Sequence, residues 1–339
     1  MIVDDSSIVR ALYSKALQNE SSIKIIACAQ DGQEAVRLAK KHLPDVIILD
    51  VEMPRMDGIT ALPLILECSP HSEVIMASRL TQRSAETSIT ALKLGAADYI
   101  PKPELDQLDS FYDELIVKIK TLGHEAKSHA RPTLTPEHVA PAPAPAMPVP
   151  KAATVHFSPN KKITALAIAA STGGPQTILK IVAGLKSSLK NIPIFITQHM
   201  PATFTTVFAE HIGNASEKPC HEGHHNEIVQ PNHIYVAPGD YHMVVKKYRN
   251  DVIIETNKDP HINFCRPAAD PMFESLSKVY GSGLLAVVLT GMGQDGADGA
   301  KIVYQNGGSV IAQDAATCVV YGMPKAVADK GVCEAILPL

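Results

Sequence analysis

The order of apolar and polar positions divides the chain into two stretches in which short apolar runs alternate with amphipathic segments. In residues 1–121, β-branched runs predict five strands, and apolar residues every three or four positions predict the helices between them. The strands are expected at Met1–Val3, Ile23–Ala29, Val46–Asp50, Val74–Ser78 and Asp98–Pro101, and the helices at Ser7–Asn19, Gly32–Lys41, Gly58–Cys68 and Ser84–Gly95. Continuous apolar strands that alternate with helices are typical of a parallel α/β sheet covered on both faces.

Residues 162–339 repeat this pattern and predict a second doubly wound α/β domain. Its strands are expected at Ile163–Ala170, Ile194–Gln198, Ile234–Ala237, Leu284–Thr290 and Gly308–Ala312, with a helix at Gln176–Leu189 and a hairpin formed by Met243–Lys247 and Asp251–Thr256. In sheets of this kind, ligands bind at the carboxyl ends of the strands, so the residues that follow each strand are the first candidates for a site.

The stretch between the two domains, residues 122–161, has a different composition, because alanine and proline alternate in it. Proline lacks a backbone donor and holds the preceding residue in an extended conformation. We therefore expect a semi-rigid Pro/Ala-rich linker rather than a packed helix. A proline-rich ligand for a partner domain is the alternative interpretation.

Composition narrows the function classes. Of the 339 residues, 45% are hydrophobic and 19% charged, which suffices for two cores and excludes general disorder. No apolar run is long enough to span a membrane, and no secretory signal precedes the acidic residues at positions 4 and 5, so we expect a cytoplasmic protein without direct membrane insertion. The six scattered cysteines form no CxxC pair and are expected to be reduced.

Charge is distributed unevenly. The chain has a net charge of −4, and its acidity lies in the first domain, where 18 acidic residues outnumber 13 lysines and arginines. A nucleic-acid partner is not expected, because no basic face is evident.

Asp4 and Asp5 follow the first predicted strand, and Asp50 ends the third. Since these strands are neighbours in a doubly wound sheet, the three carboxylates converge and suit Mg²⁺. Three solvated loop acids are the alternative.

Two more polar residues follow strands at the same sheet edge. Ser78 ends the fourth strand, and Lys102 follows the fifth. A hydroxyl and an ammonium beside the carboxylate of Asp50 are the groups that a phosphoryl group on that carboxylate would need.

These motifs resemble the receiver domain of bacterial two-component response regulators. The similarity covers residues 1–121 and rests on DDS at 4–6, LDVEMPRMDG at 49–58, MASRLT at 76–81 and YIPKP at 99–103. It implies that Asp50 accepts a phosphoryl group from a histidine kinase, with Asp4, Asp5 and Asp50 as Mg²⁺ ligands. Ser78 would be the switch hydroxyl, Lys102 the phosphate partner and Tyr99 the aromatic residue that reorients. The first strand is shorter than the family's, which a late start of the chain would explain.

In the second domain, Ser171 follows an apolar strand and begins the turn STGG before a helix. Three interpretations stay open on this motif: an N-cap serine, a phosphate cradle at a helix N-terminus, or a nucleophile. His199 ends the next strand, where it is either a satisfied core histidine or the base that takes the serine proton. Asp295 lies in a glycine-rich loop after a later strand, where it can orient the histidine.

Residues 162–339 resemble the catalytic domain of the protein-glutamate methylesterases of bacterial chemotaxis. The matching segments are AASTGGP, TQHMP, YVAPGDYH, RPAADPMF, VVLTGMGQDGADG and TCVVYGMPKA. The resemblance makes Ser171 the nucleophile, His199 the base and Asp295 the orienting acid. The backbone N–H of Met292 would help to hold the oxyanion, Thr172 would support with its hydroxyl, and the hydrolysis would need no cofactor.

The combined resemblance implies a phosphorylation-activated hydrolase of glutamate methyl esters on the cytoplasmic domains of chemoreceptors, with glutamine deamidation as a second activity. We expect the unphosphorylated receiver to pack over the Ser171 crevice. A non-catalytic regulator that docks onto receptors is the runner-up, and a DNA-binding output is disfavoured by the near-neutral second domain. Whether the pathway is flagellar chemotaxis or an alternative system stays open.

Two further groups of polar residues have no assigned role in these interpretations. Cys220, His221, His224 and His225 are zinc-ligand types, but their spacing matches no standard zinc module, and a solvent-facing loop is expected. Asp240 and Arg266 are interpreted either as structural residues or as residues at the rim of the substrate site.

Overall fold

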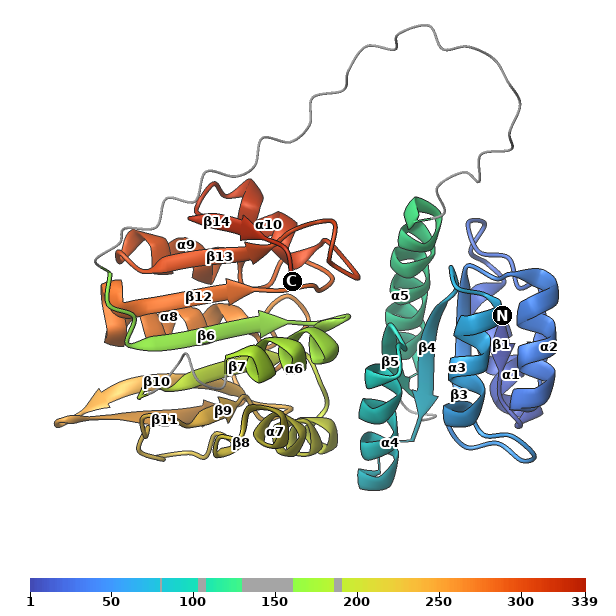
Figure 1. Ribbon diagram of the computed structural model, residues 1–339, viewed down its shortest axis with the longest axis horizontal. Coiled ribbons are helices and arrows are strands. Elements are labelled where there is room, and N and C mark those ends of the chain that lie inside the picture. Colours follow the sequence, from blue (N-terminus) through green and yellow to red (C-terminus); the bar gives the residue numbers. More distant parts are fainter. Residues whose placement is uncertain (80, 103–107, 130–160, 186–190) are drawn as a thin grey trace, which may run out of the picture.

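The computed structural model describes residues 1–79, 81–102, 108–129, 161–185 and 191–339, which form two parallel-sheet domains (Figure 1). In the first domain the strands are Ile2–Val3 (β1), Cys28–Ala29 (β2), Val46–Asp50 (β3), Glu73–Ser78 (β4) and Asp98–Pro101 (β5). They pair in parallel in the order β2-β1-β3-β4-β5. The expected contact between the first and third strands is therefore confirmed.

The predicted second strand, Ile23–Ala29, is largely wrong, because β2 contains only its last two residues. β1 has two residues itself, so it offers β2 a pairing edge of the same length.

Side-chain caps set where most helices of this domain begin. The helices are Ser7–Leu17 (α1), Gly32–His42 (α2), Gly58–Cys68 (α3), Gln82–Lys93 (α4) and Leu108–His129 (α5). Ser6, Asp31, Asp57 and Thr81 each accept a hydrogen bond from the backbone N–H three residues later. Such a bond satisfies a donor that the first turn of a helix leaves unpaired. Thr81 thus starts α4 two residues before the expected Ser84.

Helix α5 was not predicted, and it corrects the expected start of the linker. Its buried residues Leu115, Ile119 and Leu122 follow helical spacing, and the helix continues past residue 122 as far as His129. The rest of the proline-rich stretch, 130–160, lies outside the described residues, and its semi-rigid character stays a prediction.

The second domain is built on a seven-stranded sheet. Its strands are Ala165–Ala170 (β6), Ile194–Gln198 (β7), Cys220–Glu222 (β8), Ile234–Val236 (β9), Leu284–Val288 (β12), Ser309–Gln313 (β13) and Ala335–Leu337 (β14). They pair in parallel in the order β14-β13-β12-β6-β7-β9-β8. β10 (His242–Tyr248) and β11 (Asp251–Asn257) form the expected antiparallel hairpin.

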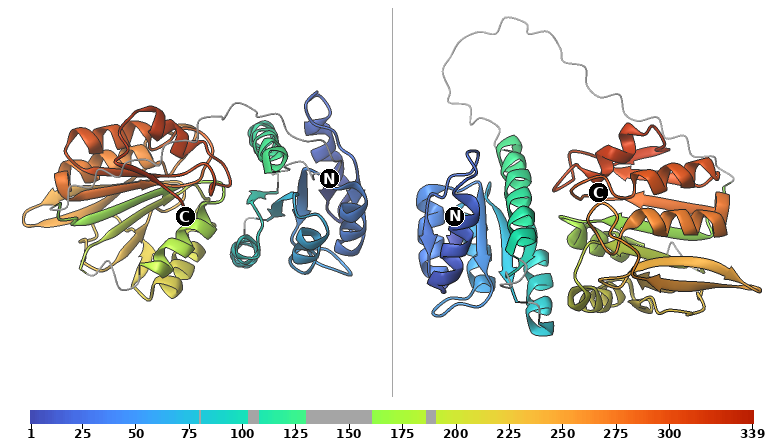
Figure 2. Two further views of the ribbon diagram at one scale, coloured as in Figure 1. Left: turned by 45° about the horizontal axis from the view of Figure 1, so that its top comes forward. Right: turned by 180° about the vertical axis from the view of Figure 1, so that it is seen from behind.

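Helices cover this sheet on both faces, as Figure 2 shows. They are Gly174–Gly184 (α6), Ala202–Ser216 (α7), Ala269–Tyr280 (α8), Ala297–Gln305 (α9) and Met323–Asp329 (α10), with a short 3-10 turn at Gly281–Gly283. No helix among the described residues combines the length and the apolar character needed to cross a bilayer.

The strand order places a switch point at β6. From β6 the chain moves to β7 on one side and later returns to β12 on the other. Loops that leave such neighbouring strands in opposite directions open a crevice at their carboxyl ends, where doubly wound proteins bind ligands. In Figure 1 this edge of the sheet faces α4, β5 and α5 of the first domain.

Candidate active site

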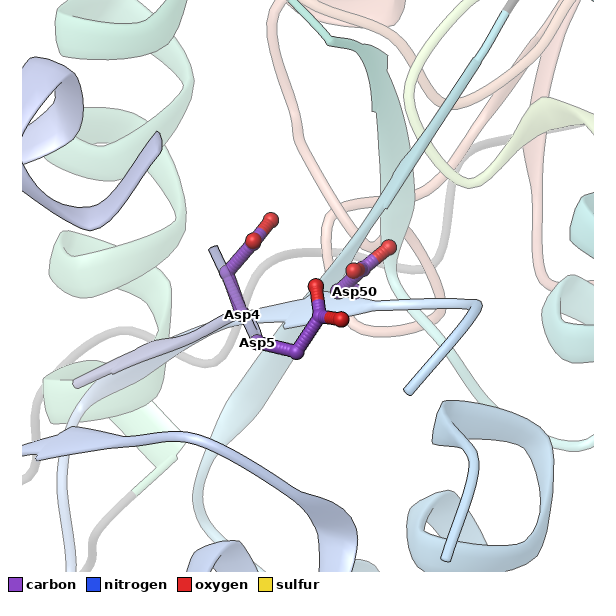
Figure 3. A group of neighbouring side chains, drawn as sticks. All are labelled: Asp4, Asp5 and Asp50. Atoms are coloured by element: carbon purple, nitrogen blue, oxygen red, sulfur yellow. The ribbon is translucent and has the colours of Figure 1, made fainter. Parts of the chain in front are cut away.

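The three acidic residues of the first domain lie together, as expected (Figure 3). Asp4 and Asp5 follow β1, and Asp50 ends the adjacent β3. One carboxylate oxygen from each residue lies within 4.8 Å of the others, and Asp4 and Asp50 are buried. Clustered carboxylates repel one another unless a cation lies among them, and an all-oxygen donor set with room for water fits Mg²⁺.

Lys102 brings a positive charge to this cluster. Its Nζ lies 2.8 Å from Asp4 Oδ2 and 2.7 Å from Asp50 Oδ2. Burial raises the pKa of Asp50 to about 6, although Lys102 opposes that rise. A cavity of about 210 Å³ opens beside Asp50 and is lined by Asp5, Ser78 and Lys102 among others. A phosphoryl group on Asp50 would therefore meet an ammonium and a hydroxyl.

Ser78 and Tyr99 each have a partner other than Asp50. Ser78 Oγ lies 3.0 Å from Ser88 Oγ on α4, and both hydroxyls are buried. Tyr99 is buried against the second domain, where its ring stacks on Phe204 of α7 with centroids 4.4 Å apart. Each of these two side chains would have to change partners to respond to events at Asp50.

Ser171 lies in the crevice of the second domain, directly after β6. The N-cap of α6 is Gly173, with φ +73°, so Ser171 is not the capping residue. The Ser171 N–H donates to Thr290 O at 3.0 Å, and its carbonyl accepts from Gln198 Nε2 at 2.9 Å. Its Oγ has no hydrogen bond to any described residue. The backbone is thus fixed while the hydroxyl stays available.

His199 and Asp295 form a pair beside Ser171. His199 Nε2 lies 2.8 Å from Asp295 Oδ2, and Asp295 is buried. The same carboxylate accepts backbone N–H groups from Ala269 at 2.6 Å and Asp270 at 3.1 Å, in the first turn of α8. Burial would raise the pKa of Asp295, but the histidine and these amides outweigh it and lower that pKa.

The ionisation of His199 follows from the same contacts. Burial lowers the pKa of His199, but the hydrogen bonds to Asp295 and Cys265 oppose it and raise that pKa to about 10. The imidazole is therefore cationic at neutral pH in this arrangement. It has to lose this proton before it can accept another from a serine.

The structure brings together the three predicted catalytic groups but hydrogen-bonds only two of them. The Nδ1 atom of His199, which is the nitrogen left free by Asp295, lies 3.4 Å from Cys265 Sγ, and it has no hydrogen bond to Ser171.

The loop after β12 approaches Ser171 closely. Gly291 donates its N–H to Val320 O, and no described residue accepts the N–H of the next residue, Met292. Met292 also marks a contact between the domains, because Thr121 Oγ1 lies 3.3 Å from its sulfur. Thr172 is tied to the first domain as well, since its Oγ1 donates to Asp98 Oδ2 at 2.7 Å.

Comparison with known proteins shows which family this chain belongs to. A family model described as CheB methylesterase matches residues 166–339, and one described as response regulator receiver domain matches residues 1–112. The chain belongs to the CheB methylesterase family. A protein-glutamate methylesterase/protein-glutamine glutaminase of group 2 operon from Rhodopseudomonas palustris is 46% identical over 100% of this chain and 90% of its own length.

Other relatives agree. A protein-glutamate methylesterase/protein-glutamine glutaminase from Azospirillum brasilense is 45% identical over 100% of this chain and 89% of its own length. The crystal structure of the Thermotoga maritima CheB methylesterase catalytic domain is 40% identical, with a TM-score of 0.50 over 52% of this chain and 93% of that one. Both the receiver and the methylesterase architecture inferred from the motifs are therefore confirmed.

Sequence patterns did not indicate several residues of this methylesterase-family site. Gln198 is buried and donates to the carbonyl of Ser171, but a glutamine at the end of a strand carries no pattern of its own. Asp98 read only as a strand residue, and Cys265 only as a reduced cysteine. The role of these residues is visible only in the folded chain, where segments distant in the sequence contact one another.

Cys220, His221, His224 and His225 form no metal site among the described residues. Among the described residues, the only group of three or more neighbouring metal-ligand types is the aspartate cluster of the first domain. The segment expected to be a loop is in part a strand, because Cys220–Glu222 (β8) pairs in parallel with β9 at the edge of the sheet. Arg266 binds Asp240 Oδ1 at 2.5 Å and two backbone carbonyls, which ties the two residues to each other.

A methyl group at position 291 tests how closely the β12 loop must approach Ser171. A Cβ on Gly291 would lie 2.8 Å from Ser171 Cβ and 2.5 Å from Met323 Sδ, so the loop must shift. We expect Gly291→Ala to reduce kcat/KM for ester hydrolysis by about 100-fold, since displacing an active-site group by an ångström has an effect of that order. Gly184→Ala is the matched control, because nothing lies within 4 Å of its added Cβ. Equal rates for the two variants would contradict the prediction.

The ionisation of His199 can be measured directly. Its immediate titratable neighbours are Asp295 and Cys265, with Asp270 behind Asp295. Because its pKa is raised, His199 should stay protonated above the ordinary histidine value of about 6.5. His211 is an internal control, since burial and Lys93 lower its pKa. Histidine ring NMR of the whole chain should show His199 titrating at a higher pH than His211, and titration of His199 before His211 would refute the assignment.

Proposed function

We propose that this methylesterase-family chain hydrolyses glutamate methyl esters by a serine mechanism and that its receiver controls the rate. The observation that carries the proposal is the His199–Asp295 pair at 2.8 Å, held at the same sheet edge as Ser171, whose hydroxyl has no hydrogen bond to a described residue. A buried acid that orients an imidazole beside a serine is the arrangement of serine hydrolases on unrelated folds.

Acylation begins when Ser171 Oγ attacks the ester carbonyl carbon. His199, once deprotonated, takes the serine proton on Nδ1, and Asp295 stabilises the imidazolium through Nε2. The carbonyl oxygen becomes an oxyanion, which the N–H of Met292 stabilises as a donor that has no acceptor among the described residues. The tetrahedral intermediate collapses, and methanol leaves with the proton from His199, so that Ser171 carries the glutamyl acyl group.

Deacylation repeats these steps with water. His199 takes a proton from the water as its oxygen attacks the acyl carbon, and then returns a proton to Ser171 Oγ. The products are a glutamate side chain and the free serine. A glutamine side chain passes through the same tetrahedral oxyanion and releases ammonia in place of methanol, so we propose deamidation as the second activity.

In the receiver, we propose that Asp50 accepts the phosphoryl group of a histidine kinase. Asp4, Asp5 and Asp50 would hold Mg²⁺, whose charge would offset that of the carboxylates and the incoming phosphoryl group. Lys102 and Ser78 line the same cavity and supply an ammonium and a hydroxyl to the phosphoryl oxygens. The hydrolytic steps themselves use only side chains and backbone groups of the second domain.

We further propose that the unphosphorylated receiver holds the hydrolase in an inactive state. The contacts that support this lie beside the nucleophile: Asp98 accepts the Thr172 hydroxyl, and the carbonyl of Ala96 accepts Gln176 Nε2 at 2.5 Å. A receiver docked here covers the carboxyl edge of the sheet, where a receptor segment must enter.

Two side chains connect Asp50 to these contacts. If Ser78 turns to a phosphoryl group, it must leave Ser88, which lies on α4, and α4 packs against α6 and α7 of the hydrolase. Tyr99 can move only by leaving the ring of Phe204. Phosphorylation at Asp50 would thereby loosen the interface.

The proposed substrates are methylated cytoplasmic domains of chemoreceptors, and the site of action is the cytoplasm, where ATP-dependent histidine kinases supply phosphoryl groups. We propose no nucleic-acid partner and no direct insertion into the membrane. The domain limits we propose are 1–121 for the receiver fold and 162–339 for the hydrolase, with α5 continuing into the connection between them.

Methanol release from methylated receptors tests this function. The wild-type chain should release methanol, and Ser171→Ala should not. A runner-up function, in which the chain docks onto receptors without catalysis, predicts receptor binding by both proteins and methanol release by neither.

A further inference from the structure

The thiol of Cys265 occupies a position in the crevice that the proposed mechanism does not use. Its Sγ lies 3.4 Å from His199 Nδ1, the nitrogen that must accept the proton of Ser171. Asp295 holds the other ring nitrogen, so the imidazole cannot turn away from the thiol without losing that bond. The imidazole of His199 therefore lies between the thiol of Cys265 and the carboxylate of Asp295 and contacts both.

The segment that carries Cys265 is anchored on both sides. Ile262 and Cys265 exchange two backbone hydrogen bonds of 3.1 and 2.9 Å. Asn263 contacts Asp270 and Gln294 through its side chain, and Arg266 is bound to Asp240. These bonds hold the backbone of the segment beside the imidazole.

The same segment is open to small molecules. Cys265 is partly exposed, and the preceding residue, Phe264, is 99% exposed with φ +64°. A thiol is a nucleophile when its proton is held elsewhere, and a partly exposed cysteine beside an imidazole is the environment of reactive cysteines. Of the other cysteines, Cys318 is buried, Cys28 is exposed on β2, and Cys68, Cys220 and Cys333 are partly exposed like Cys265.

We propose that Cys265 is a modification site for electrophiles of the unsaturated carbonyl class and that its adduct switches the esterase off. This inference rests on the proposed function for its inhibitory consequence but not for the reaction of the thiol. The sulfur attacks the β-carbon of the electrophile and forms a C–S bond while the π electrons move to the carbonyl oxygen. The Nδ1–H of the cationic His199 donates to the sulfur as it attacks, the thiol proton passes to water, and the α-carbon then gains one proton from water, so no group leaves.

The adduct inhibits because of where it lies. A group attached to Sγ fills the space next to His199 Nδ1, which Ser171 Oγ needs for its proton transfer. Ser171 itself stays unmodified, so removal of the adduct would restore the base.

Alkylation of the whole chain by N-ethylmaleimide tests the reactivity of the thiol. At neutral pH and limiting reagent, peptide mass spectrometry should find Cys265 modified about tenfold faster than the exposed Cys28. His199→Gln should remove most of this advantage and leave the rate at Cys28 unchanged. A rate at Cys265 no higher than at Cys28, or one that is unaffected by His199→Gln, would overturn the proposal, whether or not the chain is an esterase.

The inhibitory consequence has its own readout. Methanol release by the wild-type chain should fall in proportion to the Cys265 adduct, and Cys28→Ala should follow the same curve. Cys265→Ala and Cys265→Ser, each compared with its own untreated rate, should resist the reagent, and two replacements guard against a folding defect in one. A fully modified Cys265 with undiminished methanol release would refute the switch. If untreated wild type releases no methanol, the proposed function fails, and the labelling rates still decide the reactivity of Cys265.

Discussion

Ser171→Ala is expected to abolish ester hydrolysis, with a loss of roughly 10⁴- to 10⁶-fold in kcat, as removal of a serine nucleophile causes in other hydrolases. The loss should appear in kcat rather than KM, because Ser171 forms its bond only as the reaction proceeds. Its hydroxyl forms no hydrogen bond to any described residue, so the free energy of unfolding should change little. Methanol release from methylated receptors measures the rate, and urea unfolding checks the stability.

A double variant shows whether Ser171 and His199 act as one unit. The combined Ser171→Ala, His199→Ala chain should be no slower than Ser171→Ala alone, because a base without its nucleophile contributes nothing further. If the two losses multiplied instead, His199 would act in a step that does not involve Ser171. Gly184→Ala, with open space at its added methyl group, should keep the wild-type rate.

Asp98→Ala is expected to raise the rate of the unphosphorylated chain. Asp98 accepts the hydroxyl of Thr172, the neighbour of the nucleophile, and also pairs with Lys118. A hydrogen bond to a charged group contributes about 1.5–3 kcal/mol, so its loss should increase the undocked population roughly 10- to 100-fold while that state is rare. Methanol release without a phosphodonor measures the effect.

Two comparisons separate release of the receiver from a general disturbance. Asp113 is an exposed acid on α5, and Asp113→Ala should leave the basal rate unchanged. Asp50→Ala should stay at the basal rate when acetyl phosphate is added, whereas wild type should be activated. A basal rate that falls or stays constant in Asp98→Ala would contradict inhibition by docking, as would the same result for a chain lacking the receiver and α5.

Much of both sites was predictable because parallel strands deliver their final residues to one edge. Asp4, Asp50 and Lys102 end or follow strands of one sheet, and the structure places their charged atoms within 3 Å of each other in two pairs. Ser171 and His199 follow the adjacent strands β6 and β7 for the same reason.

Contacts between distant segments could not be predicted in this way. The strand pattern predicts where Asp98 lies in the first sheet and where Thr172 lies in the second. It does not predict that the two domains pack so that Asp98 contacts Thr172. Cys265 reaches His199 through a loop whose course depends on the bonds of Asn263 and Arg266, which have no periodic signature. Helix α5 was missed because the charged and proline-rich composition near it outweighed the spacing of Leu115, Ile119 and Leu122.

The most direct test is to trap the acyl enzyme. Wild-type chain activated with acetyl phosphate is mixed with a methylated receptor fragment, quenched in acid within one turnover and digested for mass spectrometry. We predict that the peptide containing Ser171 carries the glutamate side chain of the receptor as an ester, and that Ser171→Ala yields no such adduct. Two results would contradict a serine mechanism for this chain. One is methanol release by the wild type without an adduct on Ser171, and the other is methanol release by Ser171→Ala at the wild-type rate.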